Sequence, residues 1–348
     1  MEAKEAIKKV VEGKDLSEKE MEGVFSSIMS GRYTPEQIAS FLTALRIKGE
    51  TIQEITAAAR VMRKASIKIK VAGDCVIDTC GTGGSGINTF NFSTASAFVA
   101  AGCGVKVAKH GNRSASGRCG SADVLERLGV KLDVSPRLTE KLINSIGIGF
   151  MFAPLFHKSM KYAVGPRKEI GIRTIFNLLG PLCNPASPDR QVMAVYDGAL
   201  TTIIAGVLKN LGLKRAFVVH GEPGLDEVTI TGPTKVSELV SGRIRTYSLQ
   251  PSDFGFKKAP LKKILGGCPK TNSIIMKAVL TGEKGPMRDM TVMNSALALM
   301  AAGKAAALLD AVKMAEFSID SGKAYEKLDL LRKASNGVLL KDLNKGKK

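Results

Sequence analysis

The chain has 348 residues, enough for a large domain and a smaller one, and 44% of them are apolar, enough for a substantial core. No apolar run approaches the roughly 18 residues of a membrane-spanning helix, and the N-terminus lacks the apolar block of a secretory signal, so we expect a cytoplasmic protein without a membrane partner. The 51 basic and 32 acidic residues give a net charge of +19, which attracts anions in general and names no single partner.

The first 66 residues have the pattern of consecutive amphipathic helices. Their apolar residues recur three and four positions apart, as a helix with one buried face requires. Three of the expected helix starts carry a capping box, in which Ser or Thr is followed three positions later by Glu or Gln. The pairs are Ser17 with Glu20, Thr34 with Gln37, and Thr51 with Glu54. The pattern predicts a small helical domain over residues 1–70, with packing or dimerisation as its role.

From about residue 74 the pattern changes to strands, glycine-rich loops and helices in alternation. Strands are expected at 75–78 and 105–108, and helices follow them at 93–103 and 121–128. Two further buried strands, at 192–196 and 216–219, flank an expected helix at about 199–211. Residues 226–248 are expected to add an antiparallel edge, and residues 291–336 to be helical after Pro286.

This alternation predicts an α/β fold. We expect a small all-helical N-terminal domain and a larger α/β domain with a mainly parallel central sheet flanked by helices. The larger domain is assigned to residues 71–348, and part of 160–185 is expected to join the helical domain.

The first expected strand runs into the glycine-rich loop Gly81-Thr-Gly-Gly84, and Ser93 and Thr94 then open a helix. Glycines let backbone N–H groups approach a ligand closely, and free N–H groups at a helix start favour an anion. The loop matches neither the dinucleotide-binding nor the P-loop signature. It therefore predicts a different kind of phosphate or diphosphate cradle, with a structural turn that binds nothing as the alternative.

A second polar loop follows the second strand and carries the cations Lys109, Arg113 and Arg118 among glycines and serines. Two consecutive strand-to-helix loops lie at the carboxyl edge of the sheet, where open α/β folds bind ligands. One loop could cradle a phosphate while the other neutralises it. The alternative is a solvated basic loop.

The adjacent carboxylates Asp226 and Glu227 follow another buried strand. Such neighbours repel each other unless a cation relieves the repulsion. Carboxylate oxygens suit Mg²⁺, which commonly bridges one or two carboxylates to substrate phosphates. An ordinary acidic turn is the alternative.

Together these segments resemble the anthranilate phosphoribosyltransferase family. The GTGG loop with Asn91 to Thr94, the KHGNR…GSADVLERLG run from Lys109, the RTIFNLLGPL run from Arg173 and the Asp226-Glu227 pair appear in the family's order, so the likeness covers nearly the whole chain. The resemblance implies an enzyme, a pentosyltransferase of tryptophan biosynthesis. It would transfer the phosphoribosyl group of phosphoribosyl diphosphate to anthranilate, giving N-(5-phosphoribosyl)anthranilate and diphosphate. It also implies a homodimer formed through the helices and Mg²⁺ as cofactor, two ions per monomer.

The resemblance further implies roles for individual residues. Phosphoribosyl diphosphate would bind Gly81, Gly84, Ser85, Thr89, Asn91, Ser93, Thr94, Lys109, Ser116 and Ser121. Anthranilate would face Gly81, His110, Asn112 and Arg167, and Mg²⁺ would bind Ser93, Asp226 and Glu227. No residue is assigned as an acid or base, because Lys109 and Mg²⁺ would stabilise the leaving diphosphate. A loop-supporting role for His110 is the alternative, and His157, His220 and Arg173 are interpreted as structural.

Two positions depart from the family pattern. Ser85 stands where the family usually has an Asp after GTGG, so the loop loses a carboxylate. The stretch from Ser116 to Cys119 replaces a more usual Ser-Ser-Lys-Ser, which keeps a cation at Arg118 but loses hydroxyl groups.

Two other functions are compatible with parts of the sequence. A pyrimidine-nucleoside phosphorylase has a similar fold, but its glycine and lysine loops differ from these and it lacks the Asp-Glu pair. A non-catalytic relative that binds nucleic acid is favoured only by the net charge of +19. Because Asn112, Arg167, Asp226 and Glu227 are intact, we do not expect nucleic acid as a partner.

Overall fold

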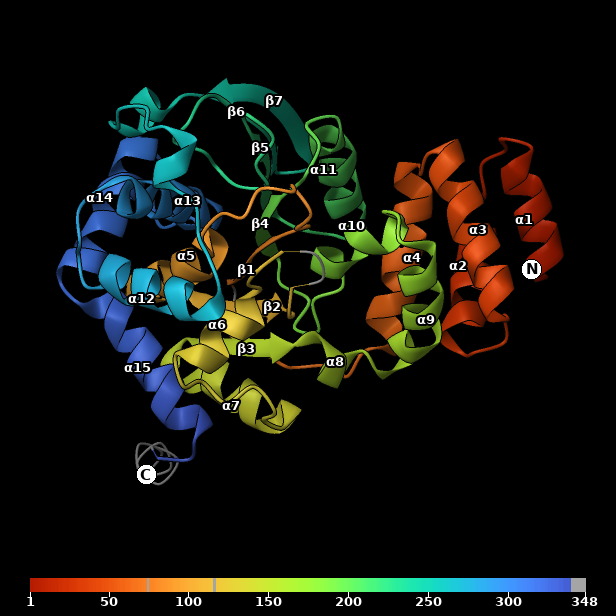
Figure 1. Ribbon diagram of the computed structural model, residues 1–348, viewed down its shortest axis with the longest axis horizontal. Helices are drawn as coiled ribbons and strands as arrows, with labels where there is room; N and C mark the ends of the chain where they lie inside the picture. Colours follow the sequence, from red (N-terminus) through yellow and green to blue (C-terminus); the bar gives the residue numbers. More distant parts are fainter. Residues whose placement is uncertain (74, 115–116, 339–348) are drawn as a thin grey trace.

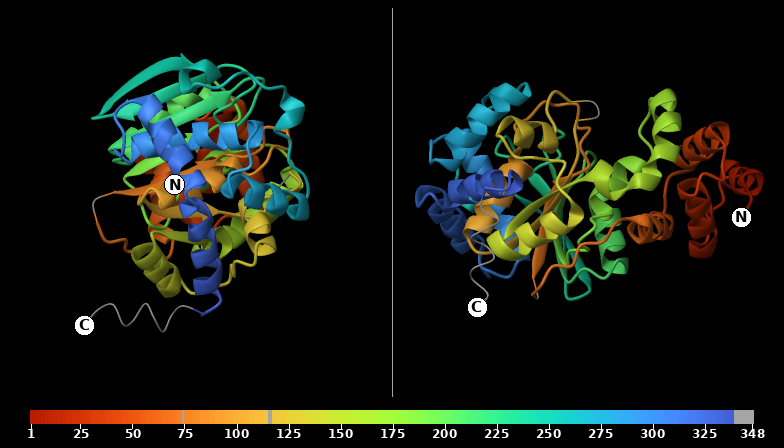
Figure 2. Two further views of the ribbon diagram at one scale, coloured as in Figure 1. Left: turned by 90° about the vertical axis from the view of Figure 1, so that its left-hand side faces the viewer. Right: turned by 90° about the horizontal axis from the view of Figure 1, so that it is seen from below.

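The computed structural model describes residues 1–73, 75–114 and 117–338. It has a helical part at its N-terminal end and a larger part built around a sheet (Figure 1). Seen from below, the N-terminal helices lie at one end of the molecule and the C-terminal helices at the other (Figure 2). Ser116, which the resemblance places at the diphosphate, lies outside the described residues. None of the described helices is long and apolar enough to span a membrane.

The helical part forms where the sequence predicts it. Its helices are α1 (Ala3–Val11), α2 (Glu18–Met29), α3 (Pro35–Lys48) and α4 (Ile52–Ala65). All three capping boxes are present, with each hydroxyl accepting from a backbone N–H and the Glu or Gln side chain accepting from the N-cap N–H. Helix α9 (Lys161–Ile170) packs on α3, and α10 (Ile175–Leu182) packs on α4.

The sheet confirms the predicted α/β fold. Its seven strands lie in the order β3-β2-β1-β4-β5-β6-β7, of which the first five are parallel and the last two antiparallel. Residues 226–248 therefore do supply the antiparallel edge, although β6 begins only at Thr234. The strands are β1 (Val76–Gly81), β2 (Lys106–Gly111), β3 (Ile148–Phe152), β4 (Arg190–Ala194), β5 (Arg215–Gly221), β6 (Thr234–Val240) and β7 (Arg243–Leu249).

Helices cover both faces of the sheet because alternate strand residues point to opposite sides. Val192 and Phe217 belong to the core under α5 (Phe92–Gly102) and α13 (Pro286–Ala301). Met193 and Val218 belong to a second core, under α11 (Leu200–Asn210), which continues into the N-terminal helices. The other helices are α6 (Ser121–Arg127), α7 (Pro136–Ile146), α8 (Ala153–Phe156), α12 (Pro269–Leu280), α14 (Leu308–Asp320) and α15 (Lys323–Ser335).

Some expected boundaries are wrong by a few residues. The strand expected at 75–78 begins at Val76 and continues to Gly81, and the one expected at 192–196 spans Arg190–Ala194. Pro286 does not precede the C-terminal helices but is the first residue of α13, where a missing N–H costs nothing. Helices α7 and α12 and strand β3 were not expected. For β3 the reason is its length, because five apolar residues are compatible with either a strand or a helix.

Candidate active site

Three polar segments leave the sheet at its carboxyl edge. The glycine loop follows β1, the basic loop follows β2, and the segment from Gly221 to Glu227 follows β5. Because β2, β1, β4 and β5 are parallel neighbours, all three segments emerge on the same side, where open α/β folds bind ligands.

The acidic pair contacts the glycine loop. A side chain added at Gly81 would place its Cβ 3.3 Å from both the backbone oxygen and Oδ2 of Asp226. The backbone N–H of Ser93, at the start of α5, lies 3.3 Å from Oε1 of Glu227 and donates to it. Asp226 therefore approaches Gly81 closely enough to disfavour a side chain there, and a helix start faces the second carboxylate.

This carboxylate pair is electrostatically unfavourable in the absence of a cation. Glu227 is buried and Asp226 half-buried. Burial raises the pKa of Glu227 well above its usual range and the charge of Asp226 raises it further, whereas Lys109 and the Ser93 N–H lower it. Two crowded carboxylates beside a hydroxyl residue are the oxygen donors that Mg²⁺ prefers, so the residues present fit a magnesium site.

Lys109 lies beneath the glycine loop rather than on the surface. Its side chain is only 3% exposed, and Nζ donates to the backbone oxygen of Thr79 in β1. Its positive charge lowers the pKa of both buried carboxyl groups, Asp78 and Glu227. The lysine is thus placed next to the acidic pair.

Asn91 joins the loops to each other. Its Nδ2 donates to the backbone oxygen of Cys119 at 3.1 Å, and its Oδ1 accepts from Nδ2 of Asn272 in α12 at 2.9 Å. Within the basic loop, Oγ of Ser121 donates to the backbone oxygen of Asn112 at 3.3 Å. The glycine loop, the basic loop and the start of α12 therefore form one connected structure.

Other expected donor-site residues make mostly local contacts. Oγ of Ser85 lies 3.4 Å from the backbone N and O of Ile87, and Thr89 forms an isolated bridge with Leu265. The hydroxyl of Thr94 is buried and has no hydrogen-bond partner in the part of the chain that the structure describes.

Of the two candidate arginines, Arg173 is the one that contacts the glycine loop. Its guanidinium donates to the backbone oxygen of Gly84 and lies 4.3 Å from the ring centre of Tyr196. The guanidinium of Arg167 lies on α9, 5.1 Å from the ring centre of Phe176. Sequence reasoning assigned Arg173 a structural role and did not place it at this loop.

His110 has an unexpected neighbour in His157. The ring centres lie 5.1 Å apart, and Nδ1 of His110 lies 3.1 Å from the backbone oxygen of Gly180. Both Nε2 atoms are buried without a hydrogen-bond partner among the described residues. His157 follows β3, the strand beside β2, and because that strand was not expected, no sequence signal paired the two histidines.

Known proteins resemble the chain over almost its whole length. Residues 73–325 match the glycosyl transferase family, a/b domain, and residues 4–66 match the helical bundle domain of that family. A relative from Pelotomaculum thermopropionicum, named anthranilate phosphoribosyltransferase, is 54% identical over 93% of this chain and 94% of its own length. This chain belongs to the anthranilate phosphoribosyltransferase family.

Solved structures of the anthranilate phosphoribosyltransferase family agree with this assignment. The enzyme from Thermus thermophilus is 41% identical, with a TM-score of 0.91 over 95% of this chain and 99% of that chain. The enzyme from Saccharomyces cerevisiae in complex with PRPP (phosphoribosyl diphosphate) and Mg is 30% identical, with a TM-score of 0.89 over 96% of this chain and 98% of that one.

The two histidines are expected to make the free energy of unfolding depend on pH in this member of the anthranilate phosphoribosyltransferase family. Burial lowers the pKa of His110 to about 3 and that of His157 to about 4, whereas a histidine in the unfolded chain titrates near about 6.5. As the pH falls below about 6.5, the unfolded chain takes up protons that the folded protein does not bind. The free energy of unfolding should therefore fall by up to roughly 1.4 kcal/mol per pH unit for each ring until about pH 4.

Urea unfolding between about pH 7 and about pH 5 measures this slope. The double variant His110→Gln/His157→Gln should flatten it, and His220→Gln, a half-buried histidine elsewhere, should not. An unchanged slope in the double variant would show that these rings are not the source of the acid sensitivity.

Cys268 is an exposed thiol at the N-cap of α12. The hydroxyl of Thr271 lies 3.5 Å from its sulfur, and this contact, followed by backbone N–H groups, lowers the pKa of Cys268 to about 7. Burial raises the pKa of Cys183 to about 12 and that of Cys80 well above its usual range. Iodoacetamide should therefore alkylate Cys268 at least about tenfold faster than any other cysteine at neutral pH.

Peptide mass spectrometry after short labelling would report this order. The labelling rate should rise with pH around a midpoint near 7, and Thr271→Val should shift that midpoint upward. Equal labelling of the other thiols would contradict the prediction.

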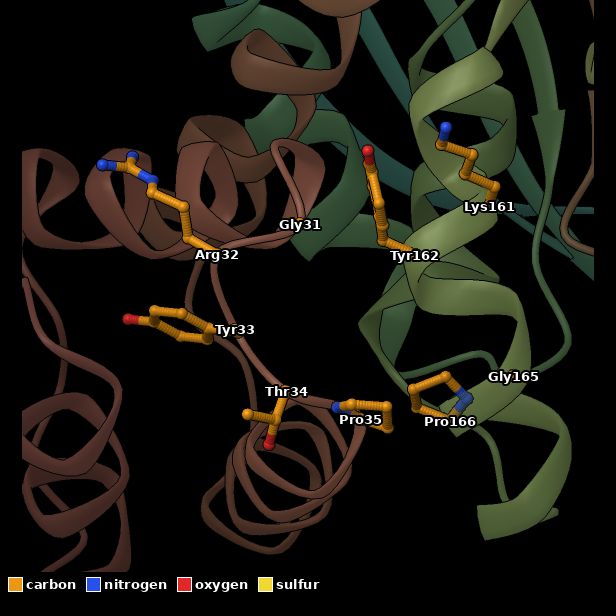
Figure 3. A pocket seen from close by; sticks show the side chains of 9 residues that line it. All are labelled: Gly31, Arg32, Tyr33, Thr34, Pro35, Lys161, Tyr162, Gly165 and Pro166. Carbon is orange, nitrogen blue, oxygen red and sulfur yellow. The ribbon is translucent and has the colours of Figure 1, made fainter.

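A groove lies in the helical part, away from the sheet edge. It has a volume of about 480 Å³ and runs between the α2–α3 corner and α9 (Figure 3). Tyr162 packs against the corner, so closely that a Cβ at Gly31 would lie 2.6 Å from its ring. The lining residues are Gly31, Arg32, Tyr33, Thr34, Pro35, Lys161, Tyr162, Gly165 and Pro166.

Proposed function

We propose that this chain is an anthranilate phosphoribosyltransferase, which transfers the phosphoribosyl group of phosphoribosyl diphosphate to anthranilate and releases diphosphate. The observation that carries the proposal is the meeting of Asp226 and Glu227 with Gly81 and Ser93 at the carboxyl edge of the sheet. A glycine turn suits a diphosphate, and the carboxylates suit the cation that accompanies it. Family membership supports the same activity.

The donor end of the site binds the diphosphate and its metal. Asp226, Glu227 and Ser93 hold Mg²⁺, two ions per monomer, which supplies charge stabilisation for the departing diphosphate. The glycine loop presents N–H groups to the phosphates, and Lys109 adds a positive charge. The remaining donor contacts are Gly84, Ser85, Thr89, Asn91, Thr94, Ser116 and Ser121.

The acceptor end orients anthranilate. Its aromatic amine has a free lone pair at neutral pH, so attack needs no strong base and the main task is alignment with the ribose carbon. Gly81, His110, Asn112 and Arg167 face the acceptor. The unpartnered Nε2 of the buried His110 supports this role, because a buried polar atom without a partner is costly until a ligand or water satisfies it.

The helical part, residues 1–70 with part of 160–185, is a separate domain from 71–348, and it forms a homodimer in the cytoplasm. Apolar side chains exposed on these helices support a second copy as the partner. Val11 is 68% exposed, Ile47 82% and Val164 54%, and the groove between the α2–α3 corner and α9 adds a concave surface nearby.

One assay tests the proposed activity. Anthranilate fluorescence should decline when the protein is mixed with anthranilate, phosphoribosyl diphosphate and Mg²⁺, and should stay constant when the donor is omitted or the metal is chelated. Constant fluorescence in the complete mixture, with a folded protein at high concentration, would refute the activity. Sedimentation of the same sample gives the oligomeric state.

A further inference from the structure

Strands β1 and β2 pair over only part of their length. The pairs Val76 with Lys106 and Ile77 with Val107 are the described register between them. By contrast, β1 pairs with β4 from Ile77 as far as Gly81, and β2 pairs with β3 from Val107 as far as Gly111. The sheet is therefore split between β1 and β2 toward the carboxyl edge, where the glycine and basic loops begin.

Two buried side chains fill this split. Oδ1 of Asp78 accepts from the backbone N–H of His110 at 3.3 Å. Nδ2 of Asn184 donates to Oδ2 of Asp78 at 2.7 Å and to the backbone oxygen of Ala108 at 2.8 Å. The β2 backbone groups that would otherwise bond to β1 are thus satisfied by an acid and an amide, both fully buried.

Burying an acid and an amide here costs more free energy than backbone hydrogen bonds between the two strands would. Burial of the Asp78 carboxyl raises its pKa, and a buried charge costs stability unless neighbours compensate for it. Lys109 is the compensating cation. Its amine donates to the backbone oxygen of Thr79 in β1, and its charge also lowers the pKa of Glu227.

We propose that Asp78 and Asn184 are positioning residues, which link β1 to β2 where their backbone ladder stops and thereby place the Lys109 amine where the diphosphate binds. The inference rests on the proposed function, because both residues act through Lys109 and only the proposed function gives Lys109 a role at the diphosphate. Neither residue touches the substrate. If Asp78 and Asn184 only stabilised the fold, replacing them would lower stability alone, and the effect would be the same with or without Lys109.

The test is a double-mutant cycle between Asp78→Asn and Lys109→Met in the full-length protein. Asp78→Asn keeps the shape and an acceptor oxygen but removes the charge beside Lys109. It should lower kcat by roughly 10- to 100-fold, the range found for outer partners of a functional group, with the KM for anthranilate nearly unchanged. In the Lys109→Met background the same substitution should have almost no further effect, because interacting residues are not additive.

Thr201→Val is the matched control. Thr201 is also a fully buried polar residue, on α11, and its hydroxyl donates to the backbone oxygen of Gly198, away from β1 and β2. It should lower the melting temperature without lowering kcat. If Asp78→Asn does not fold, Asn184→Ala takes its place in the cycle with the same expectation. The proposal would be overturned if the kcat losses of Asp78→Asn and Lys109→Met were additive. It would also be overturned if the control, at equal stability, lost as much kcat as Asp78→Asn.

Calorimetric titration with inorganic diphosphate and Mg²⁺ separates this inference from the proposed activity. If the wild-type protein binds diphosphate but does not consume anthranilate, the proposed function is wrong. The positioning role is then decided by whether Asp78→Asn weakens diphosphate binding only when Lys109 is present.

Discussion

Replacing both Asp226 and Glu227 by Ala is expected to lower turnover at least about 1000-fold, far more than replacing Arg167 by Ala. A loss of that size corresponds to roughly 4 kcal/mol of transition-state stabilisation, within the range that a bound metal supplies. In the proposed reaction the leaving diphosphate gains negative charge as its bond to the ribose breaks, and the two carboxylates would hold Mg²⁺, which would supply the neutralising charge. Arg167 would only orient the acceptor, and the reaction tolerates its loss better at saturating anthranilate.

Initial rates of anthranilate consumption at saturating Mg²⁺ and donor provide the measurement. Glu222→Ala is the matched control, because this exposed acid lies in the same segment and should leave the rate unchanged. Near-normal turnover in the double variant would show that the pair does not hold the metal.

Replacing Glu54 by Ala is expected to remove about 3–5 kcal/mol from the free energy of unfolding, the usual cost of breaking a buried ion pair. Glu54 is fully buried and joins three segments of the helical part. Its Oε1 accepts from the Leu16 N–H at 2.9 Å, and its Oε2 accepts from the Thr51 N–H at 2.8 Å and from Lys48 Nζ at 3.0 Å. Without the carboxylate, two N–H groups lose their partner, and the Lys48 amine keeps only Asp15 and the backbone oxygen of Gly49.

Urea unfolding followed by circular dichroism measures the change. Glu54→Gln, which keeps an acceptor oxygen, should be less destabilising than Glu54→Ala. Glu36→Ala changes an exposed acid in the first turn of α3 and should leave the unfolding midpoint where it is. A midpoint shift no larger in Glu54→Ala than in Glu36→Ala would contradict this account of the ion pair.

The parts of the fold that follow local rules could be predicted from the sequence. The capping boxes at Ser17, Thr34 and Thr51 depend only on residues three positions apart, and all three form. The loops after β1 and β2 could be placed at one edge because consecutive parallel strands have a fixed polarity. The same reasoning brought Asp226 to that edge.

The remainder depends on contacts between distant segments. Asn184 reaches Asp78 from beyond α10, and no spacing in the sequence indicates such a partner. His157 was interpreted as structural because β3, which brings it beside His110, is too short to be distinguished from a helix by its pattern. The sequence indicated that Lys109 is charged and near a ligand, but its burial under the glycine loop follows from the split between β1 and β2.

The core beneath α11 does not stop at the boundary between the two parts. It includes Phe25 and Leu42 of the N-terminal helices as well as Leu179 of α10 and Val218 of β5. A fragment cut near residue 70 would therefore expose a large apolar surface on each half, and neither half could be purified easily without detergent or a fusion partner. The two parts therefore share one interior and do not each have a core of their own on this side of the sheet.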